Sequence, residues 1–162
     1  MTVSRERPAR EALLTALEQA MRKSSAQGVL FSQTVAARLG ITSSDLECLD
    51  IILLNARVTA GELAAATGLT TGAITGVIDR LEKAGFAQRE RDPSDRRKIF
   101  VRALPAVEQH IAPLYRSLQQ AAAAELAGYT DKQLALLLDF FTRAGRMMIA
   151  ETAKLRDVEG SG

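Results

Sequence analysis

One segment of this chain, residues 59–102, constrains its fold more than any other part of the sequence. It begins with Thr59 and Glu62, which have the spacing of a capping box and predict the start of a short helix. Gly68 ends this helix, and Thr70 can cap a second one directly after it. Two helices that are joined by a short turn containing glycine predict a helix-turn-helix.

A β-hairpin is predicted directly after the second helix, which Gly85 ends. Residues 86–91 and residues 98–104 alternate between apolar and polar side chains, as strands do. Between them, Asp92-Pro93-Ser94-Asp95 is a strong turn signal. The hairpin therefore presents three consecutive cations at its tip: Arg96, Arg97 and Lys98.

Apolar residues recur at helical spacing through most of the remaining sequence and predict further helices at about 10–23, 44–55, 105–127 and 130–156. The stretch 24–28 interrupts the first of these, so the apolar residues after it form either a second helix or a kinked continuation. Aromatic residues make up only 4% of the chain, and tryptophan is absent. We therefore expect a mainly α fold with a small β-hairpin wing.

The sequence argues against several classes of chemical site. Cys48 is the only cysteine and has no cationic sequence neighbour, so we expect a buried, inert thiol and no disulfide. His110 is the only histidine, with no cysteine or carboxylate at ligand spacing, so neither a metal nor another cofactor is predicted. Motifs for phosphate loops, nucleophile elbows and zinc proteases are missing from the sequence, and we expect no enzymatic activity.

The sequence also predicts a cytoplasmic protein. The N-terminal residues are charged and do not have the apolar core of a secretory signal. An apolar run of about 18 residues, which a membrane span needs, does not occur in the sequence. We therefore expect no membrane partner.

Positive charge is concentrated at 80–102, although the whole chain carries a net charge of only +2. Eight Lys or Arg residues stand against four acidic residues in this segment, which gives a local charge of +4. Such a basic surface is typical of proteins that bind the phosphate backbone of double-stranded DNA in a salt-dependent way.

The second helix of the helix-turn-helix is expected to enter the major groove by its N-terminal end. Its small residues allow a close approach, and Gly72 and Gly76 cost the helix about 1 kcal/mol each, which close packing or contact with DNA must offset. Arg80 either contacts a phosphate or pairs with Glu82 or Glu62. The predicted DNA-binding residues are Thr59, Thr70, Thr71, Gly72, Ala73, Thr75, Gly76, Arg80, Arg89, Arg96, Arg97 and Lys98.

The order and spacing of these motifs resemble the MarR family of winged helix-turn-helix transcriptional regulators. The resemblance spans roughly residues 44–102 and is carried by Gly61-Glu62-Leu63-Ala64, Gly68-Leu69-Thr70, the run from Ile78 to Phe86, Arg89, and the run from Asp92 to Arg97. It implies that Arg97 enters the minor groove of DNA, with Asp95 and Asp79 orienting its guanidinium.

The resemblance also implies a homodimer held together by the terminal helices. Residues 1–43 and 105–157 are then the helical dimerisation region, and residues 44–104 are the winged helix-turn-helix DNA-binding domain. The glycine-ended tail at 158–162 is expected to be disordered.

A small aromatic or amphipathic effector is a further implication of the resemblance. Its binding site would lie between the dimerisation helices and the winged domain, although ordinary core packing is the alternative for every residue of this set. The predicted wall residues are Met21, Phe31, Val35, Leu53 and His110.

The function expected from all these features is sequence-specific transcriptional regulation. The chain would act as a repressor that an effector releases, and it would bind a pseudo-palindromic operator as a homodimer. The alternative is an architectural or protein-interaction winged-helix module that does not read DNA sequence. The dependence of binding on duplex sequence and on salt separates the two.

Overall fold

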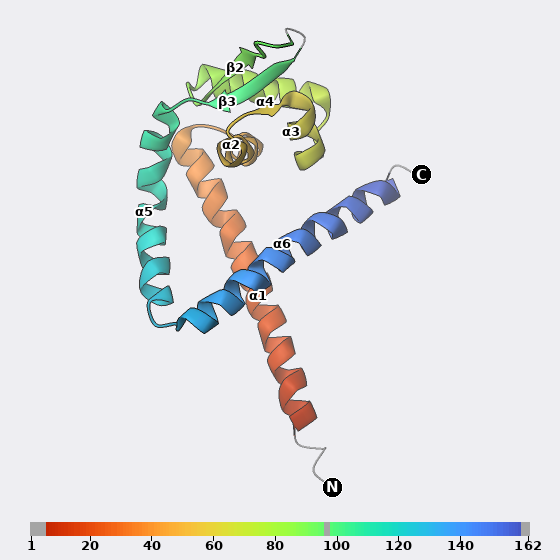
Figure 1. Cartoon of the computed structure of the whole chain (residues 1–162), viewed down its shortest axis with the longest axis vertical. Coiled ribbons are helices and arrows are strands. Elements are labelled where there is room, and N and C mark those ends of the chain that lie inside the picture. The colour runs from red at the N-terminus through yellow and green to blue at the C-terminus, as the bar shows by residue number, and fades with distance from the viewer. Residues whose placement is uncertain (1–5, 96–97, 160–162) are drawn as a thin grey trace. The chain divides into compact units, whose positions relative to one another are not determined.

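The computed structural model describes residues 6–95 and 98–159, and it confirms a mainly α fold with a small β-hairpin wing (Figure 1). The packing divides the chain into two compact units after Val107. In chain order the elements are α1 (Glu6–Leu39), α2 (Ser43–Asn55), β1 (Val58–Thr59), α3 (Ala60–Thr67), α4 (Thr71–Lys83), β2 (Ala87–Arg91), β3 (Ile99–Ala103), α5 (Ala106–Leu126) and α6 (Asp131–Glu159).

α1 is one continuous helix of 34 residues. Of the two alternatives for the residues after 24–28, the separate second helix was wrong, because these residues continue the same helix. The stretch contains no proline, and one glycine inside a helix costs only about 1 kcal/mol, which a long helix tolerates. The helix ends where Gly40 takes a φ of +70°, a left-handed conformation that glycine adopts without strain.

Three helices of the first unit begin at threonine caps, as the sequence predicted for α3 and α4. The backbone N–H of Asp45 donates to Thr42 Oγ1 at 3.2 Å, and the N–H of Thr42 donates to the Asp45 carboxylate at 3.0 Å. Thr59 and Glu62 form the same reciprocal pair at the start of α3. Thr70 Oγ1 accepts a backbone hydrogen bond from the first turn of α4 at 3.2 Å. These caps satisfy N–H groups that a helix leaves unpaired at its start.

The sheet is antiparallel, with strand order β1-β3-β2. The hairpin β2–β3 is the predicted wing, and its register pairs Arg89 with Val101. The sequence did not predict β1, whose two residues pair with β3 at Val58↔Val101 and Thr59↔Phe100. Thr59 therefore belongs to the edge of the sheet and also caps α3.

The core of the first unit lies between α2, α3, α4 and the sheet. Its fully buried aliphatic side chains come from every one of these helices, from the central strand and from the first turn of α5. They are Leu46, Leu49, Ile52, Leu63, Ile74, Val77, Ile78, Leu81, Val101 and Val107. Burial of such side chains contributes about 1.5 to 3 kcal/mol each, so this core fixes the position of α4.

The second unit consists of most of α5 together with α6. α6 begins at the predicted cap, where the Thr130 N–H donates to the side chain of Gln133 at 2.8 Å. It is helical through Glu159, and residues 160–162 of the predicted tail lie outside the described residues. Among the described helices, none combines the length and apolar character that a membrane crossing requires.

Candidate nucleic-acid interface

α4 buries one face and leaves small residues on the other. Ile74, Val77, Ile78 and Leu81 are buried, whereas the predicted contact residues Thr71, Gly72, Ala73 and Thr75 are exposed. A Cβ placed on Gly72 would meet nothing within 4 Å outside its own helix and chain neighbours. Close packing therefore does not explain this glycine. Because no side chain projects from α4 at this position, another backbone can come close to the helix.

Arg89 connects the wing to α4. Its guanidinium donates to Asp79 at 2.7 Å and to Glu82, both on α4, and its backbone N–H donates to Glu82 at 2.8 Å. Burial alone would lower the pKa of Arg89, but the hydrogen bonds and charges of these carboxylates raise it. The Arg89 side chain remains 32% exposed. Arg89 therefore links the hairpin to α4 and is still partly accessible to solvent.

The turn of the wing is built around Asp92. Its carboxylate accepts hydrogen bonds from the backbone N–H of Ser94 at 2.7 Å, from that of Asp95 at 3.1 Å, and from the Ser94 hydroxyl. These bonds, led by those from Ser94, hold the pKa of Asp92 below its usual range. The turn closes where the Lys98 N–H donates to the carbonyl of Asp95 at 2.8 Å, with the Lys98 side chain exposed.

Two of the predicted wing cations, Arg96 and Arg97, lie outside the described residues. Asp79, which was predicted to orient Arg97, accepts a hydrogen bond from Arg89. The predicted roles of Arg97, Asp79 and Asp95 on DNA therefore stay predictions.

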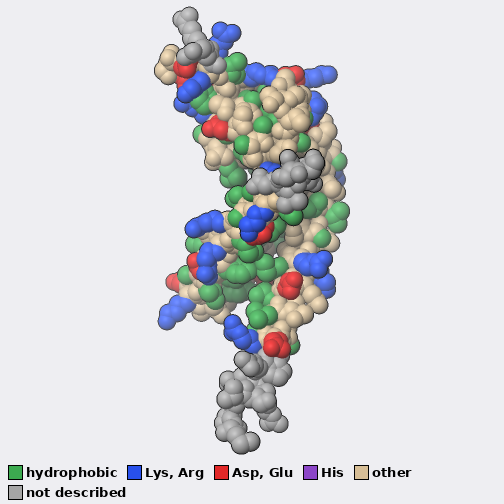
Figure 2. All heavy atoms as spheres, turned by 90° about the vertical axis from the view of Figure 1, so that its right-hand side faces the viewer, with side chains coloured by type: hydrophobic (Ala, Val, Ile, Leu, Met, Phe, Trp, Pro, Cys, Tyr) green, Lys and Arg blue, Asp and Glu red, His purple; other side chains and the backbone are tan. Residues whose placement is uncertain are grey.

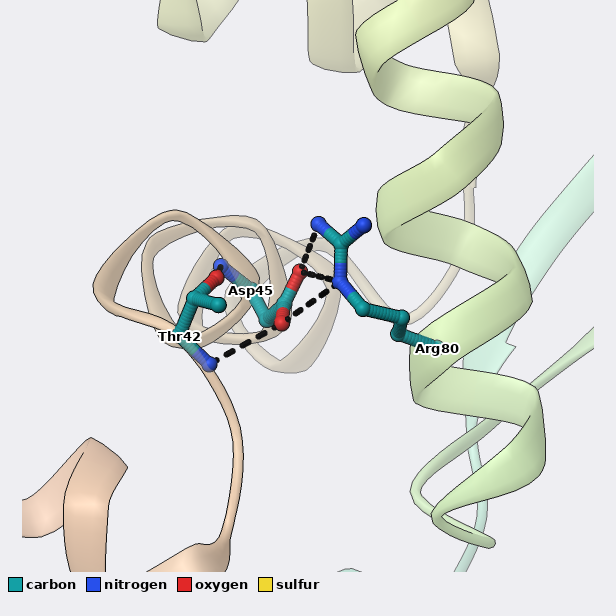
Figure 3. A network of polar contacts seen from close by, with 3 residues as sticks. All are labelled: Thr42, Asp45 and Arg80. Atoms are coloured by element: carbon teal, nitrogen blue, oxygen red, sulfur yellow. Dashed lines mark hydrogen bonds and ion pairs between the residues drawn. The ribbon is translucent and has the colours of Figure 1, made fainter.

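Arg80 pairs with a residue that the sequence analysis did not consider. Its Nε lies 3.1 and 3.0 Å from the two carboxylate oxygens of Asp45, and its Nη2 lies 2.7 Å from one of them (Figure 3). The expected partners Glu82 and Glu62 were wrong, because Glu82 binds Arg89 and Glu62 closes the cap of α3. Burial would raise the pKa of Asp45, but hydrogen bonds from Arg80 and Thr42 outweigh it and lower that pKa.

Arg57 is a second cation that sequence reasoning missed. It follows Ala56 in the loop before β1, and its guanidinium lies 4.2 Å from the centre of the Phe100 ring on β3. Such a contact contributes about 0.5 to 1 kcal/mol at an exposed site. Its only sequence signal would have been a cation beside a strand that carries an aromatic residue.

The predicted effector-wall residues fall in both units. Val35 is buried on α1, Phe31 and Leu53 are half-buried on α1 and α2, and Met21 is exposed on α1. His110 is on α5, in the second unit, and its side chain is exposed. A cleft of about 340 Å³ between α1 and α2 has other lining residues, most of them polar: Ser25, Gly28, Val29, Ser32, Gln33, Ser43, Leu46, Glu47 and Asp50.

Cys48 is buried, as expected. Burial, followed by the charges of Asp45 and Glu47, raises the pKa of its thiol to about 11. A thiol that is protonated at neutral pH is a poor nucleophile. The described residues also contain no group of three or more His, Cys, Asp or Glu side chains that could hold a metal ion.

Comparison with family models and curated proteins agrees with this geometry. The model of the MarR family matches residues 41–99. An uncharacterized HTH-type transcriptional regulator of Bacillus subtilis, YcgE, is 40% identical over 138 residues, which cover 85% of this chain and 90% of the relative.

Solved structures show the same fold. A MarR family protein from Bacillus stearothermophilus matches 85% of this chain and 96% of its own, with a TM-score of 0.66 at 22% identity. A cysteine-to-serine mutant of MarR from E. coli, solved in complex with operator DNA, matches 81% of this chain and 94% of its own, with a TM-score of 0.53 at 21% identity.

Proposed function

Because this chain belongs to the MarR family and is thus a transcriptional regulator and not an enzyme, we propose that it is a repressor that binds double-stranded DNA sequence-specifically. The observation that carries the proposal is the pairing of α4 with the wing. α4 exposes small residues at a capped N-terminus, and Arg89 fastens the β2–β3 hairpin to the same helix. A related fold, that of the E. coli MarR mutant, was solved with operator DNA.

In this proposal the N-terminal half of α4 enters the major groove. Gly72 and Ala73 let the helix come close, and Thr71 and Thr75 supply hydroxyl and methyl groups. No arginine or lysine stands in the first two turns of α4 to make a two-bonded contact with guanine. Recognition therefore depends also on the wing, where Arg97 would read the width of the minor groove and Lys98 would bind a phosphate.

We further propose that the chain acts as a homodimer through residues 1–43 and 105–157, with residues 44–104 binding DNA. Large apolar side chains lie open to solvent on α1 and on α6, and exposed hydrophobic groups are visible in Figure 2. Leu13 is 69% exposed on α1, and Leu138 and Phe141 are 70% and 65% exposed on α6. Burying each such side chain in a partner would contribute about 1.5 to 3 kcal/mol, which favours association.

The mass of the particle in solution tests the dimer. Light scattering on the wild type should give twice the 17.5 kDa of one chain. Leu138→Asp should shift the mass toward one chain, because a carboxylate would replace an apolar contact. Leu54→Asp is the matched control: Leu54 is 85% exposed on α2, within the proposed DNA-binding region, and its replacement should leave the mass unchanged. A wild type with the mass of a single chain contradicts the dimer.

A small aromatic or amphipathic effector completes the proposal. The cleft between α1 and α2 supports it, because it combines the apolar Val29 and Leu46 with the hydroxyls of Ser25 and Ser32. The test is whether such compounds release the protein from DNA. Substitution of side chains that line the cleft should then weaken this release. We also propose that the chain works in the cytoplasm, where a regulator meets chromosomal DNA.

Selection of duplexes from a random-sequence library tests DNA reading directly. The wild type should enrich a pseudo-palindromic sequence whose half-site centres lie about one helical turn apart. A gel shift at two salt concentrations should then show tighter binding to the selected duplex than to a random one of equal length. Equal binding to both would contradict sequence-specific regulation and favour an architectural role.

A further inference from the structure

Arg80 is held on one side and open on the other. Two of its guanidinium nitrogens, Nε and Nη2, donate to Asp45, and within the described part of the chain Nη1 makes no hydrogen bond. The Arg80 side chain is 50% exposed, whereas the Asp45 side chain is fully buried. The carboxylate thus fixes the guanidinium on one side, and Figure 3 shows the remaining nitrogen turned toward α4.

Gly76 keeps the approach to Nη1 open. It stands one turn before Arg80 on α4, and a Cβ placed on it would lie only 3.4 Å from Nη1. A larger side chain at this position would cover the nitrogen. A Cβ on Gly72, one turn earlier, would have no neighbour within 4 Å. The two glycines therefore leave α4 without projecting side chains on the approach to Nη1.

Arg80 is also one of the residues that line an open cleft of about 550 Å³ between the start of α2 and the end of α4. Lys83, exposed and three residues after Arg80, adds a second cation to its wall. Among the described residues Lys83 makes no ion pair. Arg80 and Lys83 therefore place two cations close together on α4, an arrangement that favours a phosphate group.

We propose that Asp45 is a positioning residue that holds Arg80 as a clamp for a DNA phosphate, with Nη1 as the donor beside Gly76. The inference rests on the proposed DNA-binding function and deepens it. Asp45 itself does not touch DNA; it acts through Arg80.

The physical reason for a buried carboxylate beside DNA is geometric. By charge alone Asp45 opposes DNA binding, since it cancels the cation of Arg80 and repels phosphates. A free arginine, however, loses about 2 kcal/mol of rotamer freedom when it is fixed on a phosphate. The three hydrogen bonds to Asp45 fix the guanidinium when the protein folds, so this loss does not recur on binding.

The charge of Asp45 and its positioning of Arg80 predict opposite effects of Asp45→Asn on DNA affinity. If the carboxylate only neutralises Arg80, its removal tightens binding. If it positions Arg80, removal weakens binding. The probe is the duplex that the wild type selects, together with a random duplex of equal length, each titrated by fluorescence anisotropy over a range of salt concentrations.

Arg80→Ala should weaken binding to both duplexes by about tenfold and reduce the slope of log affinity against log salt by about one, as loss of one phosphate contact does. Asp45→Asn should also weaken binding to both, by about three- to tenfold, and should add little to Arg80→Ala in the double variant. Glu90→Gln is the control, since the Glu90 carboxylate pairs with Arg102 and not with Arg80, and should not weaken binding.

Three results would overturn the proposal: tighter binding by Asp45→Asn, an unchanged salt slope in Arg80→Ala, or full additivity of the two. If Asp45→Asn does not fold in a thermal melt, Arg80→Lys decides. Lysine keeps the charge but cannot span both carboxylate oxygens, so it should bind more weakly than the wild type at each salt concentration. Equal affinity would rule out positioning.

Two further comparisons distinguish a failure of the proposed DNA-binding function from a failure of the Arg80 clamp. A wild type that binds no duplex contradicts the proposed function itself, whereas a wild type that binds DNA as tightly as its variants contradicts the clamp alone. Inorganic phosphate is then tested as a free anion in a thermal melt. If it stabilises the wild type but not Arg80→Ala, while both bind DNA equally, Arg80 belongs to a small-anion site and the DNA clamp is wrong.

Discussion

The guanidinium of Arg89 on β2 lies 2.7 Å from the carboxylate of Asp79 on α4, which ties the wing to the helix proposed to enter the major groove. Glu82, one turn further along α4, binds the same guanidinium and also accepts the backbone N–H of Arg89 at 2.8 Å. The two carboxylates are therefore unequal partners. Asp79 is 60% exposed and Glu82 is 32% exposed.

Replacing Glu82 by alanine should destabilise the protein more than replacing Asp79, because Glu82 is the less exposed of the two. Asp79→Ala should lower the free energy of unfolding by less than about 1 kcal/mol, as expected for an exposed ion pair. Glu82→Ala should lower it by about 1 to 2 kcal/mol, because a backbone N–H also loses its acceptor. Urea unfolding measures both. Equal losses would show that the backbone bond does not anchor the wing.

Cys48 should resist alkylation in the folded protein. Burial and neighbouring carboxylates raise the pKa of its thiol to about 11, so almost none is ionised at neutral pH. Labelling with a maleimide, followed by mass spectrometry, should be slow in buffer and fast in urea. Rapid labelling of the native chain with loss of DNA binding would instead indicate a redox-sensing role.

Ala56→Gly should stabilise the protein. Ala56 has a φ of +61° and ψ of −46°, and the N–H of Arg57 donates to the carbonyl of Asn55 across it at 2.6 Å. This is a three-residue turn with positive φ, which strains a residue that carries a Cβ. Relief of that strain should raise the free energy of unfolding by up to about 1 kcal/mol after the entropy cost of glycine.

The control is the same substitution in a helix. Ala66→Gly, on the exposed side of α3, should lower the free energy of unfolding by up to about 1 kcal/mol. A thermal melt of both variants compares the signs. If Ala56→Gly also lowers the melting temperature, the turn is not strained in the folded protein.

Asp50→Asn should stabilise the protein at neutral pH. Burial, and then the charge of Glu47, raise the pKa of Asp50. A carboxyl with a raised pKa in the folded state destabilises it at pH values above that pKa, and the penalty disappears as the pH falls below the value of about 3.9 found in unfolded chains. The gain from Asp50→Asn should therefore be present at pH 7 and vanish near pH 3. Urea unfolding at the two pH values tests this; a gain that is independent of pH would contradict it.

The helix starts were predictable because their signals are local. Thr59 with Glu62, and Thr130 with Gln133, stand within one turn of each other, and the structure forms both pairs. β1 was missed because a two-residue strand has no periodicity and exists through its pairing with β3. Arg80 was given the wrong partners because Asp45 precedes it by 35 residues, and only the packing of α2 on α4 brings them together.

The interruption of α1 illustrates a different limit. Residues 24–28 have the composition of a loop, yet the helix continues through them. Serine and glycine only weaken a helix, whereas proline breaks one, and none of the four prolines lies in this stretch. Composition indicated a lower local helix propensity there. It could not show that the stable helical turns on both sides would keep this stretch helical.

Thr59 belongs to both the sheet and α3, and Val107, in the first turn of α5, is buried in the same unit. A graft of α3 and α4 alone onto another scaffold would therefore lose the cap of α3, the partner of Arg80 and a side chain that closes the core. A transplanted module that keeps these three contacts must span at least Thr42 to Val107, and Val35 and Ala36 of α1 are buried in the same unit. Engineering a new target specificity in this chain should accordingly exchange that whole stretch, or else only surface positions of α4.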